Sequence, residues 1–448
     1  MKVLMFNGSS KNIQDLVLGD ILMGDDSKPR YVIRNDKLLT NLYEIKPPYG
    51  NAITIDESYF LSLKLSKSPY IQHDSKKKSF TIQYFDIDGK VKCLTFSYRF
   101  KDKTLVEQEA NRISMLLPQT GNAVEVKLYD FLTSTSGWKA GYKGYKIGID
   151  FPKRDVDLDP YFIGMWLGDG TASCAEITTV DSEIINYLKL EFSDLIVKPR
   201  AQNAISYRIT TGIRGATNRV LEGLRKYNLI KNKHIPLDYL FNDRKSRLRL
   251  LAGLLDTDGY YMDTNCYEIT QKRVILANEI IFLARSLGFR ATITPTLKYC
   301  IYKGEKREGI YQRMHISGDL EEIPVILERK KARAKIQMRN HLAYEIEIIN
   351  RGQGLSYQLE VDGNGKFLLE DFTVISSSRS YEKTIHQNPL SLDQRIYVMI
   401  GLLGSGKTTY VDNLKITNPD LAIIDGDSLT TTDKIINSLI KFLNFGFN

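Results

Sequence analysis

The sequence is poor in the residues that build disulfide frameworks and zinc sites. Its 448 residues include four widely scattered cysteines (Cys93, Cys174, Cys266 and Cys300) and no CxxC pair. Neither a disulfide-stabilised module nor a structural zinc site is expected, and a reducing, intracellular compartment fits best.

Long hydrophobic runs are absent too, because stretches such as Ile396–Leu403 are far shorter than the roughly 20 residues that span a bilayer. The N-terminal MKVLMFNGSS has no long apolar core and no small-residue cleavage site, so no signal peptide is expected.

What is present is the composition of a folded protein with a basic balance. The chain is 42% hydrophobic and 26% charged, and its length predicts several domains. The formal net charge of +9 favours a polyanionic partner such as nucleic acid. A merely basic surface would give the same charge, so charge alone does not establish a nucleic-acid partner, and the sequence motifs are needed to distinguish the two interpretations.

The hydrophobic pattern changes along the chain. Residues 1–70 and 342–374 show short β-branched runs between turn residues, which is typical of strands. Residues 76–100 alternate apolar and polar positions around Asp88-Gly89, a hairpin signal, and a helix is predicted from about Thr104 to Leu117. Residues 160–334 have a mixed α/β pattern. A polar stretch after residue 375 is predicted to be a linker.

Two similar segments, FIGMWLGDG (Phe162–Gly170) and LAGLLDTDG (Leu251–Gly259), are the most informative feature. In register, the equivalent pairs are Gly164 and Gly253, Gly168 and Thr257, Asp169 and Asp258, and Gly170 and Gly259. Small residues four apart share one helix face, where they allow two helix backbones to approach closely. The final glycine suits a helix C-cap. Each aspartate is therefore expected at the end of its helix, beside the partner helix.

Two carboxylates held together in this way predict a metal site. They repel each other, and the negative ends of the helix dipoles add to the repulsion. Hard oxygen ligands suit Mg²⁺ or Mn²⁺, and ions bridging two acids can hydrolyse a phosphodiester. We predict Asp169 and Asp258 as catalytic metal ligands, with Gly168 and Thr257 completing the site. The alternative is two ordinary buried helices with glycine caps, which two matching copies ending in Asp-Gly make less favourable.

These segments resemble the motifs of the LAGLIDADG (DOD-type) homing endonucleases of inteins. Lys233-His234-Ile235-Pro236 resembles the family's Lys-x-Ile-Pro block, which implies that Lys233 is an active-site lysine. The segment Glu328–Ala332 resembles the later block that supplies a second lysine, for which we choose Lys331 with Lys330 as the alternative. The resemblance implies a pseudo-two-fold αββαββα endonuclease at residues 151–338. Such a monomer would cut both strands of a long double-stranded DNA target.

The flanking segments resemble the Hint fold of inteins. The likeness covers residues 2–63 and, through YQLEVDGNGKFLLEDFTV, residues 342–374. Splicing needs an N-terminal Cys or Ser, an activating His and a terminal His-Asn. Here Met1 precedes Lys2, Tyr59 replaces the His, and Ser376-Ser377 replace His-Asn. The resemblance therefore implies a scaffold that no longer splices; an active splicing precursor is the rival interpretation.

Two further segments suggest additional modules. Residues 71–117 are similar to small AP2-type DNA-binding modules, and a plain β insertion with a basic face is the alternative. Gly401-Leu402-Leu403-Gly404-Ser405-Gly406-Lys407-Thr408 matches GxxxxGK[ST], so these glycines, Lys407 and Thr408 could bind ATP or GTP. This part resembles the beginning of a P-loop kinase. Because about seventy residues are short for such a core, we expect a truncated fragment. A working kinase or ATPase is a further rival, and a nuclease-dead DNA-binding relic is another.

The overall expectation is an α+β multidomain protein. An all-β Hint-like frame (1–70, 118–150 and 339–377) holds a possible AP2-like insert (71–117) and the endonuclease (151–338), and an α/β P-loop fragment follows (378–448). A soluble, intracellular protein without membrane association is expected, cytoplasmic, nuclear or encoded by a virus or phage.

Overall fold

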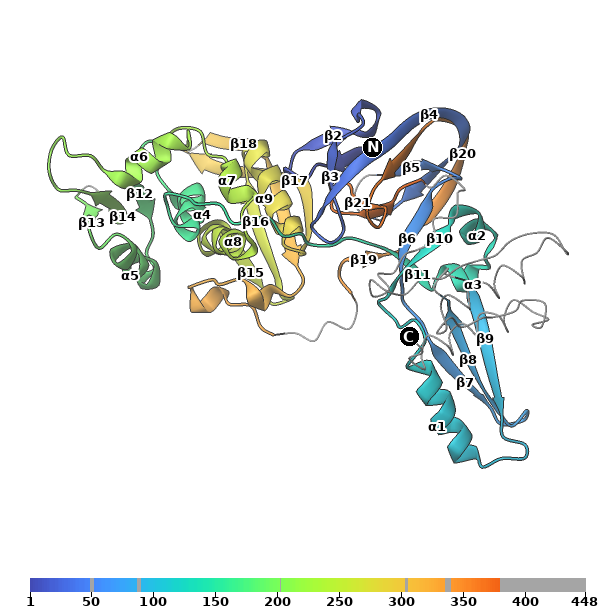
Figure 1. Cartoon of the computed structure of the whole chain (residues 1–448). Helices are drawn as coiled ribbons and strands as arrows, with labels where there is room; N and C mark the ends of the chain where they lie inside the picture. Colours follow the sequence, from blue (N-terminus) through green and yellow to red (C-terminus); the bar gives the residue numbers. More distant parts are fainter. Residues whose placement is uncertain (49–51, 87–89, 202, 303–304, 335–339, 379–448) are drawn as a thin grey trace, which may run out of the picture. The chain divides into compact units, whose positions relative to one another are not determined.

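The computed structural model describes residues 1–48, 52–86, 90–201, 203–302, 305–334 and 340–378 (Figure 1). The nucleotide-binding candidates Gly401, Gly404, Gly406, Lys407 and Thr408 lie outside the described residues. None of the helices in the described ranges is long and apolar enough to cross a membrane.

The described residues form a mixed α/β structure. Its α-helices are α1 (Lys103–Ser114), α2 (Leu128–Thr133), α3 (Ser136–Lys139), α4 (Pro160–Asp169), α5 (Ser182–Glu191), α6 (Arg219–Lys226), α7 (Leu237–Leu240), α8 (Arg244–Asp258) and α9 (Val274–Ser286). The strands before residue 150 are β1 (Lys2–Leu4), β2 (Ser10–Asn12), β3 (Ile21–Met23), β4 (Pro29–Lys46), β5 (Ile53–Asp56), β6 (Phe60–Leu65), β7 (Tyr70–Asp74), β8 (Ser79–Phe85), β9 (Val91–Ser97), β10 (Ala123–Lys127) and β11 (Tyr142–Tyr145). Those after it are β12 (Glu176–Thr178), β13 (Ile196–Arg200), β14 (Asn203–Thr210), β15 (Gly259–Met262), β16 (Cys266–Gln271), β17 (Arg290–Tyr302), β18 (Glu305–Ser317), β19 (Ala343–Tyr344), β20 (Glu347–Val361), β21 (Lys366–Leu368) and β22 (Val374–Ser376).

Strands from the two distant ends of the described chain form one β-rich frame. The long strands β4 and β20 are antiparallel, from the pair Lys46 and Glu347 to the pair Val32 and Val361 (Figure 1). A second sheet has the order β10-β6-β11-β19. Their buried faces share a core that includes Leu61 and Leu359. The strand-rich character predicted for residues 1–70 and 342–374 is confirmed.

Residues 70–114 build a small separate layer. Strands β7, β8 and β9 form a three-stranded antiparallel sheet, and α1 lies along it (Figure 1). Phe80 and Ile82 pack against Val106 and Ala110 of the helix. The Asp102 carboxylate accepts hydrogen bonds from two backbone amides of the first turn, as an N-cap residue does. The strands and helix predicted here are confirmed, although the helix ends at Ser114 rather than at Leu117.

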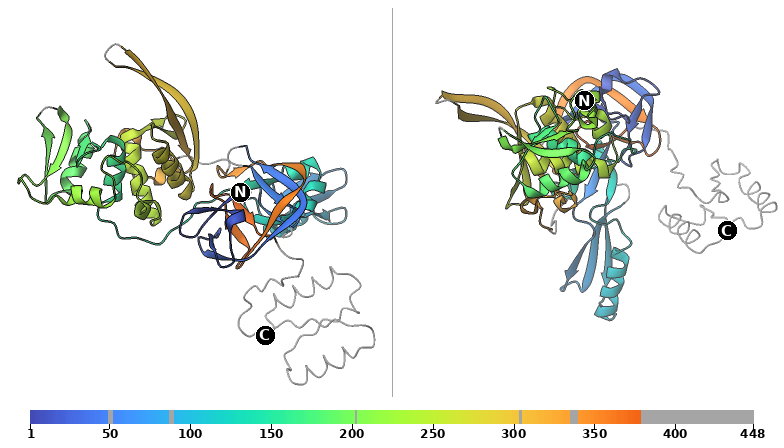
Figure 2. Two further views of the ribbon diagram at one scale, coloured as in Figure 1. Left: turned by 90° about the horizontal axis from the view of Figure 1, so that it is seen from above. Right: turned by 90° about the vertical axis from the view of Figure 1, so that its left-hand side faces the viewer.

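The same order of helices and strands occurs twice within residues 160–317. The second half runs α8, β15, β16, α9, β17, β18, and its sheet has the order β15-β16-β18-β17. The first half runs α4, β12, α5, β13, β14, where an isolated bridge from Gly170 to Ile177 takes the place of a first strand. Gly259 is paired in the same way with Ile269. Figure 2 shows the long β17–β18 hairpin projecting from the second half.

Helices α4 and α8 lie side by side with their backbones in contact (Figure 1). A Cβ atom on Gly164 would lie 2.1 Å from the carbonyl oxygen of Leu250, and one on Gly253 would lie 2.1 Å from that of Tyr161. Any side chain at these positions would push the helices apart, because backbone atoms cannot give way as a flexible side chain can. The close approach predicted from small residues four apart is confirmed.

The two glycines that end the motifs are helix C-cap residues, as predicted, and the structure shows why glycine is required there. Gly170 and Gly259 are the C-cap residues, but their φ angles are −72° and −80°, outside the left-handed region. A Cβ atom would instead lie 2.3 Å from Trp166 O at Gly170 and 2.5 Å from Leu255 O at Gly259. Because the chain leaves each helix directly into extended structure, glycine is required by crowding and not by φ.

Candidate active site

The two motif aspartates are the last residues of the paired helices α4 and α8. A Cβ atom on Gly168 would lie 3.4 Å from Cγ of Asp258, which places the end of one helix against the acid of the other. Burial raises the pKa of both carboxyl groups. The pKa of Asp258 reaches about 6, since the charge of Asp169 adds to the effect of burial. The expected convergence of two like charges is present.

Lys233 lies at the end of α4. Its side chain is buried, and its Nζ donates a hydrogen bond of 2.8 Å to the carbonyl oxygen of Gly168. The Nζ also lies 5.3 Å from the centre of the Trp166 ring. Burial lowers the pKa of Lys233 to about 8, although the charges of Asp258 and Asp169 favour the protonated form. The lysine expected from the Lys-x-Ile-Pro block is therefore at the acid pair.

At the end of α8 the structure places Lys330 and not Lys331. Nζ of Lys330 donates to the carbonyl oxygens of Leu255 (2.9 Å), Asp256 (2.8 Å) and Thr257 (3.2 Å). Lys331 turns outward and forms an exposed ion pair of 2.6 Å with Glu328. The reason is the 3₁₀ turn Glu328–Lys330, whose last residue points at the helix end. The choice of Lys331 is not supported by this geometry, and the alternative Lys330 takes its place.

Gly168 and Thr257 thus have equivalent positions, because the carbonyl of each accepts a hydrogen bond from one lysine. A cation at the C-terminus of a helix also offsets the negative end of the helix dipole. The hydroxyl of Thr257 is directed elsewhere, donating 2.9 Å to the carbonyl of Gly253.

Asp256 is a residue that the sequence reasoning did not single out. One of its oxygens, Oδ2, accepts hydrogen bonds of 2.7 Å from the Tyr161 hydroxyl and from the backbone N–H of Ile326. The other oxygen accepts 3.3 Å from the N–H of Leu327. Asp256 therefore anchors the segment that leads to Lys330. An acid at an otherwise apolar position of a buried helix was the available signal, because such a group needs partners.

The donor atoms at this site fit a hard divalent cation. The described residues contain no cluster of three or more His, Cys, Asp or Glu side chains that could hold a metal. Two carboxylates and the neighbouring carbonyl oxygens of Gly168 and Thr257 nevertheless form an oxygen-only set. Mg²⁺ takes such ligands and completes its shell with water and phosphate oxygens.

Basic side chains lie on the sheets of both halves. In the first half, Lys198 and Arg208 are register partners, and both are exposed. The next residue, Ile209, is buried on the opposite face. In the second half, Arg313 and His315 occupy alternate positions of β18, with Met314 buried between them. Each sheet therefore has an apolar face and an opposite face that carries these basic side chains. Two acids share the opposite faces: Glu176 lies 3.6 Å from Arg208, and Glu268 lies 3.6 Å from Arg313.

The positions expected to carry degenerate splicing groups meet inside the frame. Tyr59 is buried; its hydroxyl donates to the Tyr357 carbonyl and accepts 3.2 Å from the N–H of Leu359. Tyr59 also pairs with Ser378 through a β-bridge. Ser376 and Ser377 are buried, and the Ser376 hydroxyl donates 2.9 Å to Glu125.

Two comparisons with known proteins found similarity to this chain. The chain is similar to the replicative DNA helicase DnaB of Mycobacterium intracellulare, with 25% identity over 288 residues. That alignment covers 62% of this chain but only 40% of the helicase, so the chain spans less than half of that relative. A family model described as homing endonuclease matches residues 234–346, which include Asp258 and Lys330. The match supports a homing endonuclease domain over residues 234–346, and hence a DNA endonuclease at the level of that domain.

Proposed function

We propose that the chain is a site-specific, double-strand DNA endonuclease of the LAGLIDADG homing type that depends on Mg²⁺ or Mn²⁺. One observation carries the proposal: the paired helices bring Asp169 and Asp258 together, and a lysine lies at the end of each helix. The two halves would each attack one DNA strand, so a monomer could cut an asymmetric, long target.

The chemistry assigned to the protein's residues follows from their charges. A bound divalent ion would supply Lewis acidity and activate water for phosphodiester hydrolysis. Asp169 and Asp258 would hold and orient it, with the carbonyls of Gly168 and Thr257 nearby. Because the pKa of Lys233 is about 8, this side chain is mostly protonated at neutral pH. Lys233 and Lys330 would then stabilise negative charge that develops on the phosphate oxygens.

The basic sheet faces would bind the DNA. Lys198, Arg208 and Arg313 can contact phosphates, which provides affinity and register. Residues 71–117 would add an AP2-type contact through the face of the β7-β8-β9 sheet opposite α1. The exposed side chains there include Gln72 and Thr95, and such polar groups can read base edges.

The β-rich frame would be a scaffold derived from an intein and without splicing activity. The buried Tyr59 offers a hydroxyl that is already bonded to backbone groups, not an imidazole. Serines take the place of the terminal His-Asn, and serine cannot cyclise as asparagine does. ATP or GTP binding at residues 401–408 stays a prediction.

The proposal is tested by incubating the full chain with a library of duplex DNA sites and sequencing the cut ends. Double-strand cleavage at a defined site is expected with Mg²⁺ and not with EDTA. Asp263→Asn is the matched control, because Asp263 is exposed in the turn that follows β15 and should not affect cutting. No cleavage of any site by the wild-type chain, with Mg²⁺ or Mn²⁺, would refute the proposal.

A further inference from the structure

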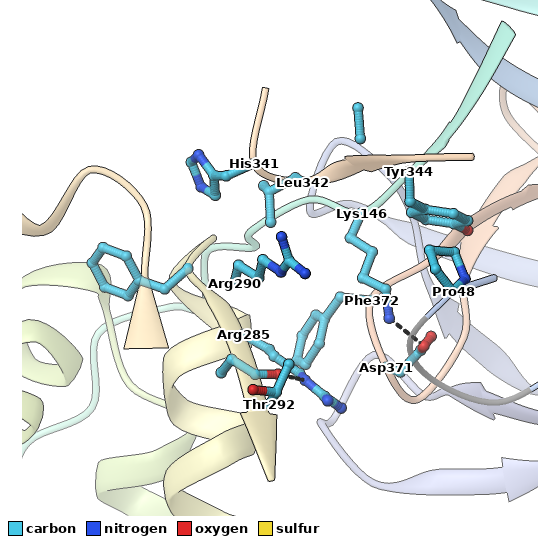
Figure 3. Close-up of a pocket in the computed structure, with 13 residues that line it drawn as sticks. Pro48, Lys146, Arg285, Arg290, Thr292, His341, Leu342, Tyr344, Asp371 and Phe372 are labelled. Atoms are coloured by element: carbon cyan, nitrogen blue, oxygen red, sulfur yellow. Dashed lines mark hydrogen bonds and ion pairs between the residues drawn. The ribbon is translucent and has the colours of Figure 1, made fainter. Parts of the chain in front are cut away.

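A cavity outside the acid pair has a strongly basic lining. Its volume is about 150 Å³, and Lys146, Arg285 and Arg290 are among the residues around it. Asp371 is its one acidic lining residue. Figure 3 shows these cations around Phe372, with the amine of Lys146 turned toward Asp371.

Asp371 is fully engaged by other partners. Its carboxylate forms an ion pair with Lys146 and accepts a hydrogen bond of 3.2 Å from the backbone N–H of Thr373. Burial alone would raise the pKa of Asp371, but Lys146 and these hydrogen bonds hold it below the ordinary value. Asp371 therefore offsets the charge of Lys146 and does not also neutralise a second cation.

Arg285 is the cation that this arrangement leaves without a close counter-charge. Its Nε donates 3.0 Å to the carbonyl of Ala291, while in the described part of the chain Nη1 and Nη2 have no hydrogen-bond or ion-pair partner. Burial lowers the pKa of the guanidinium, although Asp371 and Glu370 favour its charged form. A half-buried charge without a close partner is costly, and an incoming anion would relieve that cost.

We propose that this cavity binds the phosphate group of a small molecule. The guanidinium fork of Arg285 presents two parallel donors to phosphate oxygens. The second arginine in the lining, Arg290, adds positive charge, which favours a phosphate dianion over a carboxylate. The apolar lining residues Phe289, Leu342 and Phe372 can enclose an organic group attached to that phosphate. Such a ligand would touch both α9 of the endonuclease region and the loop before β22 of the frame.

The test is isothermal titration calorimetry with inorganic phosphate, phenyl phosphate and benzoate. The full chain carries Lys407→Ala, so that the predicted phosphate loop does not contribute. We expect saturable one-to-one binding of both phosphates and at least tenfold weaker binding of benzoate. Arg285→Ala should weaken phosphate binding at least tenfold, and Arg351→Ala, which removes an exposed arginine paired with Glu44, should leave it unchanged.

A second variant separates ligand binding from folding. Thr292→Trp fills the cavity from its wall without removing a charge, and it should abolish binding while circular dichroism stays unchanged. Four results would overturn the proposal. Three concern the small ligands: no saturable phosphate binding, equal affinity for benzoate, or undiminished binding in both Arg285→Ala and folded Thr292→Trp. The fourth is that Arg285→Ala weakens binding of duplex DNA but not of phosphate.

Discussion

Removing one of the two crowded charges should stabilise the protein at neutral pH. The pKa of Asp258 is raised from 3.8 to about 6, so the folded state prefers the protonated acid. The stability associated with this preference is fully present below pH 3.8 and is lost as the pH rises through about 6. With about 1.4 kcal/mol for each pKa unit, the ionised carboxylate costs up to about 3 kcal/mol above pH 6.

Asp258→Asn keeps the shape of the side chain and removes this cost. We therefore expect the free energy of unfolding at pH 7.5 to rise by about 1–3 kcal/mol, with almost no change at pH 3.8 and below. The gain should appear between pH 4 and 6. Asp263→Asn makes the same chemical change at an exposed position and should show no such pH dependence.

The assay is urea unfolding in EDTA at several pH values, followed by intrinsic fluorescence and circular dichroism. A loss of stability in Asp258→Asn at pH 7.5, or a gain that is equal at all pH values, would refute the reasoning. Adding Mg²⁺ should raise the wild-type melting temperature more than that of the variant, because a cation offsets the repulsion only where both acids remain.

Three further outcomes follow from the described contacts and from the sequence. Lys330→Met should lower the DNA cleavage rate at least a hundredfold, whereas Lys331→Met should leave it unchanged; equal effects on the rate constant would contradict the assignment of Lys330. Lys407→Ala should leave cleavage unchanged, and a clear loss in a variant that circular dichroism shows to be folded would implicate the phosphate loop. Because Tyr59 and Ser377 replace the groups needed for splicing, the purified chain should keep its full length, and mass spectrometry would reveal any fragment ending near Ser377.

The helix pair was predictable because its signal is local. Gly164 and Gly253 lie on one face of each motif, and the acid follows at a fixed spacing, so the sequence alone implies the convergence of Asp169 and Asp258. The strand-rich ends were also readable from β-branched runs. Their pairing across about 300 residues, through β4 and β20, came only from a resemblance.

The choice between Lys330 and Lys331 could not be predicted, because it depends on contacts between residues far apart in the sequence. Lys330 and Lys331 are adjacent and chemically identical, and the Asp256 carboxylate, bonded to residues 326 and 327, helps to fix which of them faces the helix end. Nothing local in the sequence distinguishes them. The C-cap positions of Gly170 and Gly259 were predicted correctly, but the crowding that requires glycine at Gly170 depends on the path of the following residues and has no local signal.

Cleavage of a defined target by three purified proteins tests the central claim most directly. Wild type, Asp169→Asn and Asp258→Asn are incubated with the target duplex and Mg²⁺, while gel shifts measure binding and thermal melting measures stability. Each variant should lose double-strand cleavage by several orders of magnitude and still bind the target, since affinity comes mainly from basic contacts to phosphates. Full double-strand cleavage by either asparagine variant would remove that acid from the active site and contradict the endonuclease mechanism proposed for this chain.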